Sequence, residues 1–241
     1  MLVERGLFAS REKARRAVMA GVVDVGGQRI DKPGTAVRED AELSVRESEP
    51  FVSRAGRKLD AALDRFDIDP TGLVCMDVGA STGGFTDCLL ERGAERVYAI
   101  DVGYGQLDMR LRDDPRVVVM ERVNARHLQP GDLPEACDLI TVDLSFISLA
   151  KVVPALIPHL AEGGRLVTLI KPQFEAGRQQ VGKGGIVRDE AVRQSAIDST
   201  ARQLEAFGLR RIDLFDSPVT GARGNREALA LFVCFWEPDH E

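Results

Sequence analysis

The sequence predicts an α/β fold in which a parallel sheet follows a small, separate N-terminal part. The first observation is a series of short, continuous apolar runs from residue 74 onward. The second is that helical segments lie between most of these runs. Strands that are apolar along their whole length, alternating with helices, are typical of a parallel sheet covered on both faces. The third observation is a polar stretch, "RESEP", which ends in Pro50 and separates the two parts.

The N-terminal part, residues 1–47, holds the basic stretch "SREKARRAVMAG", which suits a short amphipathic helix. A strand, a Gly-Gly turn, a Lys-Pro-Gly turn and a strand ending at Val45 follow it. This part is too small to build a large core. We expect a linker over residues 48–56 and a second domain over residues 57–241.

The second domain is expected to begin with a helix near residues 58–66. Its expected strands are 74–78, 97–100, 117–120, 139–142, 166–170, 211–215 and 229–235. Its further helices are expected at 86–92, 149–161 and 189–207.

Composition excludes several classes of protein. Hydrophobic residues make up 44% of the chain and charged residues 29%, as in ordinary globular proteins. No apolar run approaches the roughly 20 residues that a membrane span needs. The N-terminus carries charges where an export signal needs an apolar stretch, so we expect a cytoplasmic protein without membrane contacts. The four cysteines, Cys75, Cys88, Cys137 and Cys234, are scattered, so we expect free thiols and no metal site.

The charge pattern bears on nucleic-acid binding in two opposite ways. The net charge of −6 argues mildly against it. Four basic residues nevertheless cluster in the N-terminal helix, at Arg11, Lys13, Arg15 and Arg16, against one acidic residue, Glu12. Local patches matter more than the total charge, although a solvated helix face has the same pattern.

Ligands of open parallel sheets bind at the carboxyl ends of the strands. The first predicted strand runs into "DVGASTGGFTDCLL", where Asp77 is followed by a glycine-rich loop that opens a helix. The glycine spacing differs from G-x-G-x-x-G, and no phosphate-loop Gly-Lys-Ser/Thr is present, so dinucleotide and triphosphate sites are disfavoured. Asp101 follows the second strand, where a carboxylate accepts hydrogen bonds from ribose hydroxyls. This arrangement is the one used by S-adenosylmethionine enzymes; a structural turn with a helix cap is the alternative.

Charged residues also stand at the ends of later strands. Asp143 follows the fourth strand, Lys171 follows the fifth, and Glu227 precedes the last. A lysine is costly at the end of a buried strand unless a partner receives its charge. Lys58 lies at a helix start, an awkward place for a cation. We therefore expect two lysines and two carboxylates to gather beside the glycine-rich loop.

The stretches "DVGASTGGFTDCLL", "VDLSFISL", "IKPQFE", "GKGGIVRD" and "SPVTGARGNREALALF" resemble the TlyA family over nearly the whole chain. These are S-adenosylmethionine-dependent rRNA cytidine 2′-O-methyltransferases, a family that also carries the name haemolysin. The resemblance implies an S4-like RNA-binding domain that lacks its first few residues, followed by an FtsJ-like (RrmJ-like) domain. That domain is a Rossmann-like class I methyltransferase fold with strand order 3-2-1-4-5-7-6 and an antiparallel last strand. Ala55 replaces a glycine that is usual in this family.

The resemblance also implies site residues. The family's catalytic Lys-Asp-Lys-Glu group maps onto Lys58, Asp143, Lys171 and Glu227. We expect the cofactor S-adenosyl-L-methionine to be bound by Asp77, Gly79, Ala80, Ser81, Thr82, Gly83, Gly84, Phe85, Asp101, Val102, Asn124 and Asp143. We expect rRNA to be bound by Arg5, Arg11, Lys13, Arg15, Arg16, Arg54, Arg178 and Lys183.

The implied reaction is 2′-O-methylation of cytidine in 16S or 23S ribosomal RNA, or in both. Lys171 then acts on the 2′-hydroxyl as a base or as an orienting group, and no metal is needed. The glycine-rich segment 175–189 is predicted to form a lid over substrate, with an ordinary flexible loop as the alternative. Candidate stacking surfaces for a flipped base are Phe85, Tyr104, Phe146 and Phe174.

Two other functions are compatible with parts of the sequence. A small-molecule methyltransferase of the same fold leaves the basic N-terminal part unexplained. A membrane-active haemolysin needs an apolar span or a strongly apolar amphipathic helix, and neither is visible. The sequence gives no indication of the oligomeric state.

Overall fold

The computed structural model describes residues 1–19, 21–45, 50–221 and 223–234, with the side chain of Arg178 left out. The chain forms two compact units, residues 1–49 and 50–241, which are described separately below. Residues 48 and 49 of the expected linker lie outside the described residues, as does Phe235, where the last strand was expected to end. Residues 51–56 pack with the second unit: the Val52 N–H donates to the Asp87 carboxylate at 2.7 Å.

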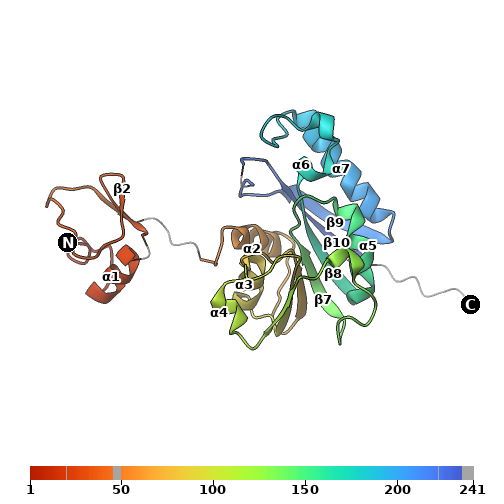
Figure 1. The fold of residues 1–241 in the computed structure, drawn as a ribbon, viewed down its shortest axis with the longest axis horizontal. Coiled ribbons are helices and arrows are strands. Elements are labelled where there is room, and N and C mark those ends of the chain that lie inside the picture. Colours follow the sequence, from red (N-terminus) through yellow and green to blue (C-terminus); the bar gives the residue numbers. More distant parts are fainter. Residues whose placement is uncertain (20, 46–49, 222, 235–241) are drawn as a thin grey trace, which may run out of the picture. The chain divides into compact units, whose positions relative to one another are not determined.

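The first unit is one helix against a small antiparallel sheet (Figure 1). Helix α1 (Arg11–Met19) buries Ala14 and Val18 and leaves its basic residues exposed. The sheet has the order β2-β1-β3, with β1 (Val23–Val25), β2 (Gln28–Ile30) and β3 (Leu43–Val45). The helix and the turns lie where the sequence predicts them.

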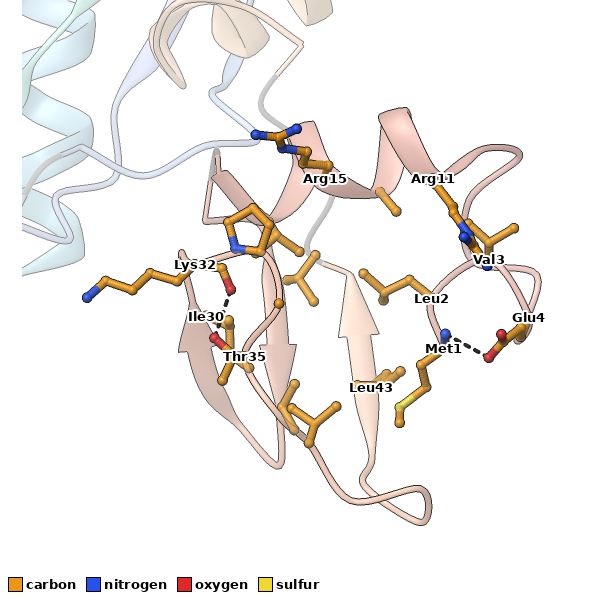
Figure 2. Close-up of a pocket in the computed structure, with 17 residues that line it drawn as sticks. Met1, Leu2, Val3, Glu4, Arg11, Arg15, Ile30, Lys32, Thr35 and Leu43 are labelled. Carbon is orange, nitrogen blue, oxygen red and sulfur yellow. Dashed lines mark hydrogen bonds and ion pairs between the residues drawn. The ribbon is translucent and has the colours of Figure 1, made fainter.

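A hollow of about 460 Å³ lies between α1, the strands and the first residues of the chain. Figure 2 shows apolar side chains such as Leu2, Ile30 and Leu43 lining it, with the Lys32 ammonium extending away from it. Arg11 and Arg15 also line this hollow. The first unit therefore combines a small apolar interior with basic side chains at its margin.

The second unit is a seven-stranded sheet in the order β6-β5-β4-β7-β8-β10-β9. Strand β10 is antiparallel to both of its neighbours, and the other pairs are parallel. The strands are β4 (Val74–Val78), β5 (Arg96–Asp101), β6 (Val117–Glu121), β7 (Cys137–Val142), β8 (Leu160–Ile170), β9 (Leu209–Asp216) and β10 (Ala228–Cys234). In chain order this is 3-2-1-4-5-7-6, so the predicted fold class and strand order are confirmed.

Helices cover both faces of this sheet. One apolar cluster joins the sheet to α2 (Ala55–Arg65), α3 (Gly84–Glu91) and α4 (Met109–Arg112). A second cluster joins the other face to α5 (Val153–Leu156) and α7 (Glu190–Glu205) (Figure 1). Neighbouring residues of β4 alternate between the two clusters, with Cys75 in one and Met76 in the other. Burial on both faces explains why the strands are apolar throughout.

The structure differs from the sequence-based expectation in its shorter elements. The helix expected over residues 149–161 is broken into a 3₁₀ turn (Leu149–Lys151), α5 and a second 3₁₀ turn (Ile157–His159). Pro154 and Pro158 lack the N–H groups that a continuous helix needs, which explains the breaks. Helix α2 begins at Ala55, earlier than expected, and α4 and α6 (Pro172–Glu175) were not predicted.

No helix in the described part of the chain is long and apolar enough to cross a membrane.

Asp77 is a carboxylic acid inside the core. It lies on β4 with no exposed surface, and it accepts hydrogen bonds from the hydroxyls of Thr86 at 2.7 Å and Thr141 at 3.4 Å. Burial raises the pKa of Asp77 to about 7, while the hydrogen bond from Thr86 acts to lower it. The folded state therefore holds a proton here in a pH range where an unfolded aspartic acid is ionised.

This pKa predicts a pH dependence of stability. Between about pH 4 and about pH 7 the folded state binds more protons at Asp77 than the unfolded state, so this group's contribution falls as the pH rises. Asp77→Asn removes that slope and keeps an acceptor for Thr86. Urea unfolding gives the free energy of unfolding of each protein at each pH. We expect the value for the variant minus the value for the unmodified protein to be larger at pH 8 than at pH 5. An equal difference at both pH values would contradict the raised pKa.

Candidate active site

The loop after β4 is held in a strained shape by neighbouring backbone and by Asp101. Gly79 has a φ of +88°, and a Cβ atom there would collide with the carbonyl oxygen of Asp143. Ser81 also has a left-handed φ, of 50°, and its N–H donates to Oδ2 of Asp101 at 2.8 Å. Oδ1 of Asp101 accepts from the N–H of Gly103 at 2.6 Å. One carboxylate thus fixes the loops that follow β4 and β5.

A cavity of about 510 Å³ opens beside these loops at the carboxyl ends of β4, β5 and β7. Its lining combines apolar side chains with one carboxylate from each of two strand ends. Six predicted cofactor residues line it: Gly79, Ser81, Asp101, Val102, Asn124 and Asp143. The other lining residues were not predicted to bind the cofactor, although Phe146 was predicted as a stacking surface. They are Val78, Ile100, Gln106, Val123, Ala125, Arg126, Leu144, Ser145, Phe146, Ile147 and Val152.

The other predicted cofactor residues lie outside that cavity. A smaller hollow of about 210 Å³, on the side of the loop that faces α2, is lined by Ala80, Thr82, Gly84 and Phe85. Gly83 and Asp77 line none of the cavities described here. Asp77 lies within the strand and not at its tip, which explains why its carboxylate points into the core.

The four charged residues form two ion pairs. Nζ of Lys171 lies 2.5 Å from Oδ1 of Asp143, and it donates to the hydroxyl of Ser145 at 3.1 Å. Nζ of Lys58 lies 2.5 Å from Oε2 of Glu227. The second pair is the more buried, with side-chain exposures of 7% and 3% against 11% and 15% for Lys171 and Asp143.

The topology explains how these residues meet. Strands β7 and β8 are parallel neighbours, so the residues after them, Asp143 and Lys171, share one edge of the sheet. Strand β10 runs in the opposite direction, and its first residue, Ala228, pairs with Ile170. Glu227 directly precedes Ala228, so it lies at the same edge of the sheet as Lys171, at the start of its strand and not at the end. Lys58 comes from the first turns of α2.

A cavity of about 700 Å³ lies over the two lysines. Its charged and polar lining includes Arg54, Lys58, Lys171, Gln173 and Glu227. Three residues, Ser81, Ser145 and Phe146, line this cavity and the 510 Å³ cavity alike, so the two adjoin.

The glycine-rich segment after α6 is tied to the loop that precedes β10. The side chain of Asn225 accepts from the N–H of Val187 at 3.0 Å and donates to the carbonyl of Gly185 at 2.8 Å. Arg223 donates to the carbonyl of Gly184 at 3.0 Å. Asn225 is buried, so these bonds close the segment against the edge of the 700 Å³ cavity.

The four candidate stacking residues differ in exposure. Phe146 is 90% exposed with a left-handed φ of 67°, and its ring centre lies 5.0 Å from that of Phe174. Tyr104 is exposed and carries the guanidinium of Arg122 over its ring at 4.2 Å. Phe85 is 2% exposed and packs in the core, so its ring offers no free face.

The basic residues predicted to bind RNA are mostly exposed. This holds for Arg11, Lys13, Arg15 and Arg16 on α1 and for Arg54 and Lys183 in the second unit. Arg16 forms an ion pair with Glu12 at 2.7 Å. Arg5 donates to the backbone carbonyls of Glu39 and Ala41, so part of its donor capacity is used within the first unit. The side chain of Arg178 lies outside the described residues.

Among the described residues, no group of three or more histidine, cysteine, aspartate or glutamate side chains is arranged to hold a metal ion.

Comparison with known proteins agrees with this geometry. Residues 51–234 match the model of the FtsJ-like methyltransferase family, and residues 1–43 match the S4 domain model. The 16S/23S rRNA (cytidine-2′-O)-methyltransferase TlyA of Mycobacterium tuberculosis is 48% identical over 94% of this chain and 85% of that protein. Hemolysin A of Brachyspira hyodysenteriae is 41% identical over 95% of each chain.

A solved structure from Streptococcus thermophilus, provisionally named a hemolysin, has a TM-score of 0.78 and 41% identity. It covers 98% of this chain, and 87% of its own length is matched. The predicted family resemblance is thus confirmed: the chain belongs to the FtsJ-like methyltransferase family.

Proposed function

We propose that this protein transfers the methyl group of S-adenosylmethionine to the ribose 2′-hydroxyl of a cytidine in ribosomal RNA, 16S, 23S or both. The observation that carries the proposal is the adjacency of two cavities. One is built like a methyltransferase cofactor site, and the other is lined by Lys58 and Lys171. The TlyA relative, with 48% identity over most of both chains, supports the choice of rRNA cytidine.

The residues of the 510 Å³ cavity fit the proposed cofactor. Gly79 lets the loop pack directly on the backbone of Asp143, and Asp101 keeps further acceptor lone pairs toward the cavity. Val102 and Ile147 provide apolar lining for a purine. When bound, the cofactor supplies an electrophilic methyl group on a sulfonium.

In the proposed mechanism, Lys171 acts on the 2′-hydroxyl. While it is paired with Asp143 its ammonium is a donor, so it orients the hydroxyl oxygen for attack. If the ammonium gives up a proton, the same nitrogen becomes the acceptor for the hydroxyl proton. Asp143 and Ser145 fix its position in either role. The buried Lys58–Glu227 pair supports the same edge of the cavity, where negative charge develops on the oxygen.

We propose the following division of the chain. Residues 1–47 form the S4-like RNA-binding domain, and residues 57–241 form the methyltransferase domain. Residues 48–56 connect the two, and the part from residue 51 onward packs on the methyltransferase domain. The exposed basic residues of α1 contact phosphates, and segment 175–189 covers the substrate. A ribosomal RNA substrate implies a cytoplasmic location.

The first prediction concerns the cofactor. Asp101→Ala removes one of the two carboxylates that line the 510 Å³ cavity. We expect the affinity for S-adenosylmethionine to fall by about 10- to 100-fold, since hydrogen bonds to charged groups are the stronger ones. Asp113→Ala, an exposed aspartate outside the cavity, is the matched control. Isothermal titration calorimetry measures both. Unchanged affinity of the Asp101 variant, with its fold intact by circular dichroism, would rule out this cavity as the cofactor site.

The second prediction concerns the reaction. The protein with cofactor should introduce 2′-O-methyl groups at cytidine in ribosomal subunits, mapped by primer extension at low nucleotide concentration, and not in free cytidine. Lys171→Ala should lower the rate by about 100-fold or more, the range for removal of an acid–base group. Lys151→Ala, on an exposed turn, should leave it unchanged.

These measurements separate the alternatives. Methylation of free nucleosides at a comparable rate would favour a small-molecule enzyme. Near-normal activity of the Lys171 variant would remove Lys171 from the mechanism.

The third prediction concerns RNA binding by the first domain. Arg11→Ala with Arg15→Ala should weaken binding to ribosomal RNA and reduce the slope of log affinity against log salt by about 2, because each arginine neutralises about one phosphate. Arg38→Ala is the control, because Arg38 is already paired with Asp40. Filter binding at several salt concentrations measures the slope, and an unchanged slope would exclude both arginines from the RNA interface.

A further inference from the structure

We infer that Gln173 is a positioning residue of the proposed reaction, which orients Glu227 and through it Lys58. This inference rests on the proposed function. Gln173 is the third residue in the run Lys171–Pro172–Gln173, at the start of α6, and it lines the 700 Å³ cavity. The composition and periodicity of the sequence give no reason to single it out.

The contacts of Glu227 define the role of Gln173. Oε2 of Glu227 pairs with Lys58 at 2.5 Å, and Oε1 accepts a hydrogen bond from Nε2 of Gln173 at 3.1 Å. Gly221 packs so closely on Oε1 that a Cβ atom there would collide with it. The carboxylate is thus held from three sides, and Gln173 supplies the second polar contact.

The orientation of the Gln173 amide follows from the chemistry of its partner. An ionised carboxylate only accepts hydrogen bonds, so the amide nitrogen faces Glu227 and the amide oxygen faces away. That oxygen is buried and has no hydrogen-bond partner among the described residues. A side chain selected only for stability would have both ends satisfied, because a buried acceptor without a partner is costly. The arrangement therefore favours a role in holding Glu227.

Gln173 also connects the two ion pairs. Lys171 pairs with Asp143, and two residues later the side-chain amide of Gln173 donates to Glu227. Three consecutive residues therefore contact both ion pairs. Removal of the amide leaves Glu227 with a single polar partner, so the Lys58–Glu227 pair is free to turn. We expect kcat to fall and the affinity for the cofactor to stay the same, because Gln173 does not line the 510 Å³ cavity.

The test compares Gln173→Leu, Gln173→Glu and the control Gln203→Leu, an exposed glutamine on α7. Leucine keeps most of the volume and removes the donor. We expect its kcat for rRNA methylation to fall by about 10- to 100-fold, with the Kd for S-adenosylmethionine unchanged. The control should match the unmodified protein throughout.

The glutamate variant gives a readout that a purely structural role would not move. A protonated carboxyl at position 173 donates to Glu227 as the amide does, whereas an ionised one repels it. The ratio of its kcat to that of the unmodified protein should therefore rise as the pH is lowered, while the ratio for the leucine variant stays flat.

Normal kcat in the leucine variant, or a flat ratio in the glutamate variant, would overturn the inference. A fall in kcat accompanied by an equal loss of cofactor affinity and of melting temperature would also overturn it, because it indicates a structural role. If the unmodified protein methylates no ribosomal RNA, the proposed function fails instead, and the two failures are distinguishable.

Discussion

The buried ion pair between Lys58 and Glu227 is the constraint on which the catalytic edge of the sheet depends. Two charges that are nearly removed from water are tolerated only when each satisfies the other, and loss of one partner costs about 3–5 kcal/mol. The pair joins Lys58, on α2 near the start of the second unit, to Glu227, which lies 169 residues later and directly precedes β10. Buried pairs are weak contributors to net stability compared with apolar packing. Their placement beside a cavity is therefore better explained by function than by stability.

The reversed direction of β10 makes this pair possible. In a wholly parallel sheet, every strand would deliver only its last residues to the carboxyl edge. Because β10 is antiparallel to β8 and β9, it delivers the residue before its start, Glu227, to that edge, beside Lys171 and Asp143. A single reversed strand thus adds a carboxylate to a site that the parallel strands leave incomplete. The segment before β10 then carries Asn225, which closes the glycine-rich segment over the same cavity.

The parts that the sequence predicted are those with a regular signal. Continuous apolar runs located all seven strands, and strand ends pointed to Asp143 and Lys171, which form an ion pair. The same reasoning placed Lys58 and Glu227 near them, but no pattern in the sequence indicated which lysine pairs with which carboxylate. Gln106 and Gln173 were missed because a lone polar residue in a loop or short helix carries no such signal. Pro154 and Pro158 lie inside the helix that was expected over residues 149–161, and their presence in the sequence already argued against a continuous helix there.

Asp77 shows a further limit of sequence-based prediction, since the pattern of a strand does not reveal which carboxylate points into the core.

The difference in burial between the two ion pairs assigns them different parts in the proposed reaction. Lys171 and Asp143 are the more exposed pair and lie where the two cavities adjoin, so a ribose hydroxyl can reach them without displacing core residues. Lys58 and Glu227 also line the 700 Å³ cavity but are less exposed, and Glu227 accepts a further hydrogen bond from Gln173. A group that must exchange a proton or a hydrogen bond with substrate in each turnover has to be reachable, whereas a group that fixes geometry is most effective when it is buried and held. This distinction favours Lys171 as the residue that acts on the hydroxyl and the Lys58–Glu227 pair as its support.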